Sequence, residues 1–190
     1  MKQLFFLSQL KKQIYDPGFL IFENKQLRQL LDEQVTSSTN LVSARVMLDK
    51  QSPYLNSFII NSGSNKEIKN GMAVLDGKNF VGRIVDVNFF SSRVLLVTDL
   101  NSKISVLIEP SGYHAILSGR GTNKPTLEYL PENHKVQSGN KVYTSGKEGI
   151  FSPGIPIGEV RMSNEKNSVS LFSDISQIVF ININIGDKKN

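Results

Sequence analysis

The residues best suited to chemistry are two histidines, His114 and His134, and their surroundings argue against a catalytic role. A serine hydrolase needs a histidine held between a carboxylate and a serine hydroxyl. His114 opens a predicted strand and His134 lies in a polar turn, so neither segment places a serine beside the imidazole. We therefore expect both to be ordinary surface or structural histidines.

Two short lysine motifs give no better support for catalysis. Ser138 and Lys141 match the S-x-x-K pattern of serine acyl-enzymes, but here the pattern lies in a Gly-Asn turn, whereas in those enzymes it opens a helix. Gly146-Lys147 resembles part of a phosphate loop, yet the earlier glycine is missing and Glu148 replaces the hydroxyl residue that binds magnesium. The chain also lacks cysteine and paired carboxylates. We expect no catalytic residue, no cofactor and no metal site.

Composition is that of a globular protein with a mixed-charge surface. The chain has 190 residues, of which 39% are hydrophobic and 21% charged, and its formal net charge is +5. Basic residues are interleaved with acidic ones, and only 11–12 and 188–189 are basic doublets, so we expect no nucleic-acid partner. No apolar run approaches the roughly 20 residues of a membrane helix. We expect this chain to be soluble, or to be the soluble part of a longer anchored protein.

Leucines at three- and four-residue spacing predict helix over residues 1–36, interrupted at Pro17. After the interruption, Leu20, Leu27 and Leu31 repeat at the spacing of a coiled-coil seam, although over barely two heptads. Two interpretations stay open. The segment forms a short coiled coil for self-association, or its helix docks on the domain that follows.

From residue 41 onward, short apolar runs alternate with turn residues, which predicts strands packed as a sandwich or barrel. Asp76-Gly77 indicates a tight hairpin, and Gly82 indicates a bulge or sharp bend. We expect Gly63 and Gly71 to adopt positive φ in turns. The predicted strands cover residues 41–48, 58–60, 73–75, 80–87, 93–99, 104–109, 114–117, 126–130, 141–144 and 177–185.

The segment 148–158 combines two prolines and three glycines with the apolar residues Ile150, Phe151 and Ile155. A proline-stiffened apolar loop loses little conformational entropy on binding, so it suits a protein-contact surface. The other interpretation, which we favour, is that these side chains plug the end of a barrel.

The order of the turn and strand motifs resembles that of the rod shape-determining protein MreC family. The resemblance is close over residues 24–160 and looser elsewhere, and it rests on many short motifs in sequence order rather than on any one of them. They are residues 24–31, 44–46, 61–64, 68–74, 81–87, 91–99, 101–102, 127–130, 136–142, 144–146 and 151–160.

This resemblance implies a mainly β fold of two small barrels, similar to the halves of chymotrypsin, preceded by a helix or short coiled coil. It implies a helical segment at 1–36, a first barrel at 41–89 completed by 160–186, and a second barrel at 90–159. In the family the second barrel is inserted in the first.

The implied function is a non-catalytic scaffold of the bacterial cell-elongation machinery, which makes peptidoglycan and maintains rod shape. Such scaffolds self-associate and bind the membrane protein MreD and the elongation-specific penicillin-binding protein. They lie on the periplasmic side of the inner membrane, held by a single-pass anchor that is missing from this chain. The alternative is a serine hydrolase on the same trypsin-like double barrel.

Overall fold

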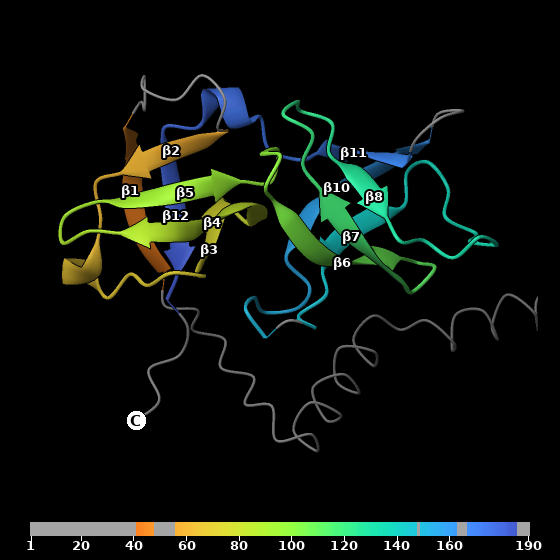
Figure 1. The fold of residues 1–190 in the computed structure, drawn as a ribbon, viewed down its shortest axis with the longest axis horizontal. Helices are drawn as coiled ribbons and strands as arrows, with labels where there is room; N and C mark the ends of the chain where they lie inside the picture. Colours follow the sequence, from red (N-terminus) through yellow and green to blue (C-terminus); the bar gives the residue numbers. More distant parts are fainter. Residues whose placement is uncertain (1–40, 48–55, 148, 163–166, 186–190) are drawn as a thin grey trace, which may run out of the picture. The chain divides into compact units, whose positions relative to one another are not determined.

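A computed structural model describes residues 41–47, 56–147, 149–162 and 167–185. All twelve strands in these ranges belong to two closed antiparallel barrels of six strands each (Figure 1). The expectation of a mainly β fold with two small barrels is therefore confirmed. The predicted helical segment 1–36, with Leu20, Leu27 and Leu31, lies outside the described residues.

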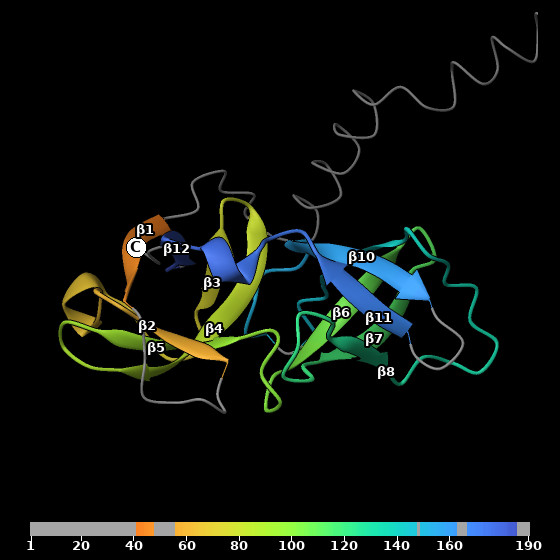
Figure 2. The same ribbon diagram turned by 90° about the horizontal axis from the view of Figure 1, so that it is seen from above.

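The first barrel joins strands from both ends of the described chain. Its strands neighbour one another in the order β1-β12-β3-β4-β5-β2. Figures 1 and 2 show the C-terminal strand β12 (blue) beside the N-terminal strand β1 (orange). The strands are β1 (Leu41–Met47), β2 (Ser57–Ile60), β3 (Ala73–Asp76), β4 (Asn79–Val87), β5 (Ser92–Leu96) and β12 (Phe180–Asn184).

The second barrel is continuous in sequence and lies between β5 and β12. Its strands neighbour one another in the order β10-β11-β8-β7-β6-β9. Two single turns of 3-10 helix, η1 (Ser64–Lys66) and η2 (Ile175–Gln177), lie in connections outside this barrel. Its strands are β6 (Lys103–Glu109), β7 (Tyr113–Ser118), β8 (Thr126–Glu128), β9 (Lys141–Thr144), β10 (Pro156–Met162) and β11 (Asn167–Leu171).

The barrel boundaries differ from those we expected at 89/90 and 159/160. Strand β5 belongs to the first barrel, because it pairs with both β4 and β2. Strands β10 and β11 belong to the second barrel, where they pair with each other and with β9 and β8. The reason is physical. Strands of both barrels alternate apolar and polar residues in the same way, so the pattern identifies strands but not their partners.

Alternation across each strand separates a buried face from an outer face, as β12 illustrates. Ile181 and Ile183 are buried in the first barrel, whereas Phe180 on the opposite face is 64% exposed. Burying each isoleucine contributes about 1.5–3 kcal/mol. A slip of one residue would exchange the two faces, so the hydrophobic pattern fixes the register of this strand.

Three glycines serve different purposes. Gly71 has φ of +87°, as expected, but Gly63 has φ of −140°, so the prediction of positive φ there was wrong. Gly63 is required by close approach instead, because a Cβ on it would lie 2.1 Å from the carbonyl oxygen of Asn88. A Cβ on Gly82 would lie 2.3 Å from the carbonyl oxygen of Leu95, and the β3–β4 register shifts beside Gly82, in agreement with the expected bulge.

Each barrel has its own hydrophobic core, and the core of the second barrel includes side chains from the first. Ala73, Leu75 and Phe80, from β3 and β4, belong to the same buried cluster as the interior of the second barrel. They lie on the faces of β3 and β4 that point away from the first core. Further buried members of this cluster are Val97, Ile104, Val106, Ile108, Leu117, Val142, Phe151, Ile157, Val160 and Val169.

The connection from β5 to β6 is held by a buried carboxylate. Asp99 is fully buried, and its Oδ2 accepts a hydrogen bond from the backbone N–H of Asn56 at 2.9 Å. Its Oδ1 accepts a second bond from the N–H of Asn101 at 2.7 Å. Hydrogen bonds to an ionised acceptor are among the stronger ones in proteins. Asp99 thus ties the start of β2 to the segment that leaves the first barrel.

Candidate functional site

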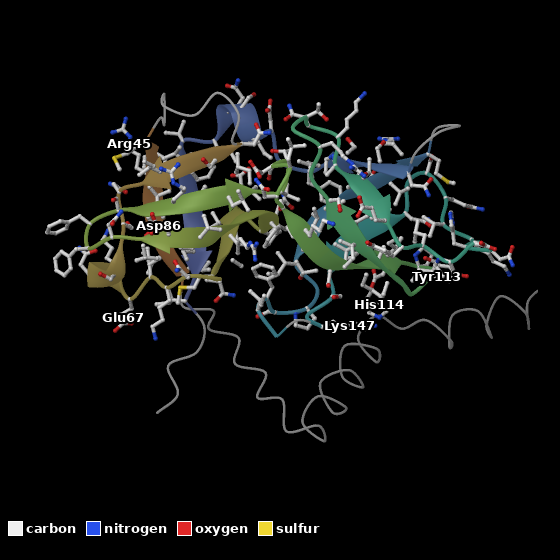
Figure 3. The ribbon with its side chains drawn as sticks, in the orientation of Figure 1. Arg45, Glu67, Asp86, Tyr113, His114 and Lys147 are labelled. Atoms are coloured by element: carbon white, nitrogen blue, oxygen red, sulfur yellow. The ribbon has the colours of Figure 1, made fainter. Side chains whose placement is uncertain are left out.

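Among the described residues, neither histidine is paired with a serine hydroxyl. His114 is exposed on β7, on the outside of the second barrel (Figure 3). His134 is half-buried, with Nε2 3.4 Å from the side-chain nitrogen of Asn167. In the described ranges no serine hydroxyl is bonded to either imidazole. The interpretation as a serine hydrolase therefore has no support in this part of the chain.

The serines of the lysine motifs accept hydrogen bonds from backbone N–H groups. Ser138 Oγ accepts a hydrogen bond from the N–H of Met162 at 3.0 Å, and Ser145 Oγ accepts one from the N–H of Lys147 at 3.3 Å. Neither hydroxyl is paired with a base. Among the described residues, no group of three or more histidine or carboxylate side chains is placed to hold a metal ion.

The loop between β9 and β10 is clamped by the buried side chain of Thr144. Thr144 Oγ1 donates a hydrogen bond to the carbonyl of Ser152 at 2.7 Å and accepts one from the N–H of Ile155 at 3.0 Å. The N–H of Gly154 also bonds to the Thr144 carbonyl at 2.8 Å. Because both sides of the loop are bonded to one residue, its shape is fixed by the fold.

The three apolar residues that we singled out in this loop have different surroundings. Phe151 is buried, and its ring meets that of Phe80 edge to face, with centroids 5.0 Å apart. Ile155 packs against the second core, whereas Ile150 is 43% exposed. A Cβ placed on Gly71 would lie 3.6 Å from Ile150. Ile150 is thus accessible at the surface, while Phe151 and Ile155 pack inward.

The turn between β4 and β5 carries an exposed aromatic pair that our sequence analysis did not single out. We call residues 88–91 the aromatic tip. Phe89 and Phe90 are 61% and 71% exposed, and their rings meet edge to face with centroids 4.6 Å apart. The sequence contained a signal for this exposure, the two consecutive phenylalanines between Asn88 and Ser91. Neighbouring residues of a strand point to opposite faces, so a strand could not have buried both rings on one face.

None of the helical segments in the described ranges has the length and apolar character needed to cross a lipid bilayer.

The sequence model of the family described as "Rod shape-determining protein MreC, barrel core" matches residues 46–185. The cell shape-determining protein MreC of Cereibacter sphaeroides is 35% identical over 180 residues, which are 93% of this chain and 59% of that protein. The chain thus spans less than two thirds of that relative.

Solved structures share the same double barrel. MreC from Listeria monocytogenes aligns with 96% of this chain and 91% of its own, with a TM-score of 0.72 and 24% identity. A complex between a penicillin-binding protein and MreC from Helicobacter pylori also matches. The alignment covers 78% of this chain and all of the matched chain of that complex, with a TM-score of 0.59 and 15% identity.

Proposed function

Because the chain belongs to the MreC family, we propose that it is the barrel-bearing part of a non-catalytic scaffold for bacterial cell elongation. The observation that carries this proposal is the family match over residues 46–185, which takes in both barrels from β2 to β12. In this role the protein maintains rod shape by positioning the proteins that make peptidoglycan.

The scaffold role agrees with the chemistry of the described residues. The serine hydroxyls of the lysine motifs accept hydrogen bonds from backbone N–H groups, and His134 contacts the side-chain amide of Asn167. Each barrel is closed, so its strands have no free edge, and its surface is set by outward-facing side chains. Such a surface is suited to binding partner proteins in a fixed geometry.

We propose three partners for the full-length protein. The first is a second copy, bound through Leu20, Leu27 and Leu31. The second is the elongation-specific penicillin-binding protein, in line with the Helicobacter pylori complex. The third is an MreD-type membrane protein. This arrangement places the barrels on the periplasmic side of the inner membrane, with the full-length protein anchored by a single membrane helix. In the loop after β9, Ile150 is the candidate contact.

The test is genetic, in the bacterium that encodes the protein. Depletion of the full-length protein should turn rods into rounded cells, and re-expression should restore them. Variants Ser138→Ala and Ser145→Ala should restore rod shape as well as the wild type does. Covalent labelling of either serine by a fluorophosphonate, or normal rods after depletion, would contradict the scaffold function.

A further inference from the structure

The second barrel has a surface cavity of about 720 Å³, where β8, β10 and β11 meet the loop that precedes β8. Three cations line it, Arg120, Lys124 and Arg161, and no aspartate or glutamate does so among the described residues. A cavity of this volume suits a small molecule or the headgroup of a larger one. The proposed scaffold function gives this cavity no role.

The strand register explains why polar side chains gather at the cavity. Arg161 on β10 pairs with Ser168 on β11, and Ser168 pairs with Thr126 on β8. The residues beside this row, Val160 and Val169, are buried in the second core, so alternation turns the row itself outward. Figure 2 shows β10 and β11 (blue) side by side in the second barrel. The three side chains therefore lie together on its outer face.

Arg120 is held in place on one side of its guanidinium. Its Nε donates a hydrogen bond to Thr126 Oγ1 at 2.8 Å, and its Nη2 donates one to Glu128 Oε1 at 2.7 Å. Its Nη1 has no hydrogen-bond partner among the described residues. Thr126 accepts from Arg120 and keeps its own hydroxyl proton to donate. A guanidinium fixed in this way binds an oxygen anion with little further loss of side-chain entropy.

The other two cations are also available to a ligand. Arg161 Nη2 lies 3.7 Å from Glu159 Oε2, beyond hydrogen-bond distance, and the Arg161 side chain is 62% exposed. The Lys124 ammonium has no ion-pair partner in the described part of the chain. Hydrogen bonds from charged donors to an anion are roughly twice as strong as those between neutral groups. Arg161 and Lys124 therefore keep strong donors for an anion.

The charge around the cavity matches a dianion. The lining cations and their ion-pair partners carry a net charge of +2, from the cations Lys103, Arg120, Lys124 and Arg161 and the anions Glu128 and Glu159. The segments that adjoin β11, 131–135 through His134 and 163–166 in sequence, each contain one lysine and one glutamate, so neither changes this balance. A phosphate monoester carries a charge of about −1.5 to −2 at pH 7 and three acceptor oxygens. A lone carboxylate would leave part of the positive charge unbalanced.

We propose that this cavity binds a phosphate monoester, with Arg120, Lys124 and Arg161 holding its oxygens and the Thr126 hydroxyl donating a further hydrogen bond. The phosphate belongs either to a lipid headgroup or to a soluble ester, two sources with the same chemistry that the experiment distinguishes. The site goes beyond the proposed scaffold function and does not rest on it.

Isothermal titration calorimetry of the full chain tests the proposal, with two probes that carry the same group. One probe is glycerol 3-phosphate, and the other is phosphatidylcholine vesicles that contain phosphatidic acid. We expect at least one probe to bind. The variant Lys124→Gln/Arg161→Gln should raise the dissociation constant of that probe about tenfold or more, because it removes two of the three charged donors.

The matched control is Arg45→Gln/Lys147→Gln, which removes the same two types of exposed cation and the same net charge outside the cavity. Arg45 lies on β1 in the first barrel (Figure 3). Lys147 lies in the loop that enters β10 at Pro156, whereas the cavity is at the other end of that strand. This control should change the dissociation constant less than about twofold. Thermal melts establish that both variants fold, and Lys124→Gln alone, again expected to weaken binding, replaces the cavity variant if that one melts lower.

Each result decides the proposal. Binding of glycerol 3-phosphate that only the cavity variant loses supports a soluble ester, and binding of the vesicles alone, lost in the same way, supports a lipid headgroup. The proposal is overturned if the wild type binds neither probe, if both variants weaken binding equally, or if succinate, a dianion without phosphate, binds as tightly as glycerol 3-phosphate. Cell shape after depletion is scored separately, so this site and the scaffold function succeed or fail independently.

Discussion

At the scale of single residues, Gly63 lies where the loop after β2 passes against the carbonyls of the β4–β5 turn. Its backbone angles are open to any residue, so the constraint comes only from the space that a side chain would occupy. The same contact holds the aromatic tip in place, because Ser64 and Asn65 follow Gly63 and bond to the tip.

We predict that Gly63→Ala lowers the free energy of unfolding by about 1–3 kcal/mol, through steric displacement of the β4–β5 turn. The matched control is Gly139→Ala, which has φ of +90° but nothing within 4 Å of an added Cβ. That control should cost about 1 kcal/mol from backbone strain alone. Urea unfolding of the three proteins measures both effects. A Gly63 variant as stable as the wild type would show that the turn moves aside freely.

Such residue-level roles could be predicted from sequence only in part. Glycine in a turn indicates positive φ, and this was correct for Gly71. It was wrong for Gly63, because close approach between distant segments leaves no local signal. Asp99 is a similar case. Its two backbone partners, Asn56 and Asn101, include one far along the chain, so its burial could not be inferred from neighbouring residues.

At the scale of elements, the loop between β9 and β10 links the second core to a strand of the first barrel. Thr144 fixes the backbone of the loop, and Phe151 then reaches Phe80 on β4. Sequence alternation found most strands but missed β10 and β11 altogether. Pro156, at the start of β10, normally signals a turn. Proline is tolerated in a strand at a bulge, and the β9–β10 register shifts between Pro156 and Gly158.

Phe151→Ala should lower the free energy of unfolding by about 3–5 kcal/mol, because it removes a buried ring from the shared core. Ile150→Ser, one residue away but 43% exposed, should cost less than about 1 kcal/mol. Chemical denaturation followed by circular dichroism distinguishes the two. If Phe151→Ala is as mild as Ile150→Ser while binding to the penicillin-binding protein falls, Phe151 is a partner contact rather than a core residue.

At the scale of the whole molecule, the first barrel depends on a strand from the far end of the chain. We predict that deleting residues 178–190 removes β12 and opens the first barrel between β1 and β3. Hydrogen exchange should then show loss of amide protection in β1 to β5, with greater retention in β6 to β11. Deletion of residues 186–190, which contain no described strand, is the control. Equal protection in the two truncated proteins would mean that β12 is dispensable.

A second prediction at this scale concerns self-association. Leu20, Leu27 and Leu31 form an apolar stripe in the sequence, and burying each leucine is worth about 1.5–3 kcal/mol. Deleting residues 1–35 should leave the two barrels folded and weaken dimer formation, as measured by sedimentation velocity. The triple variant Leu20→Ser/Leu27→Ser/Leu31→Ser should have the same effect. The same oligomer with and without the segment would assign self-association to the barrels.

The insertion of the second barrel also sets the order in which the chain can fold as it is made. The ribosome synthesises all strands of the second barrel, which end at residue 171, before it reaches Phe180–Asn184. Until then β1 to β5 can form only an open sheet, in the order β3-β4-β5-β2-β1, whose outer strands β3 and β1 have unpaired backbone groups. Open strand edges are templates for aggregation. The nascent protein is therefore most prone to aggregation through its N-terminal strands. This tendency ends when β12, the last strand to be made, closes the first barrel.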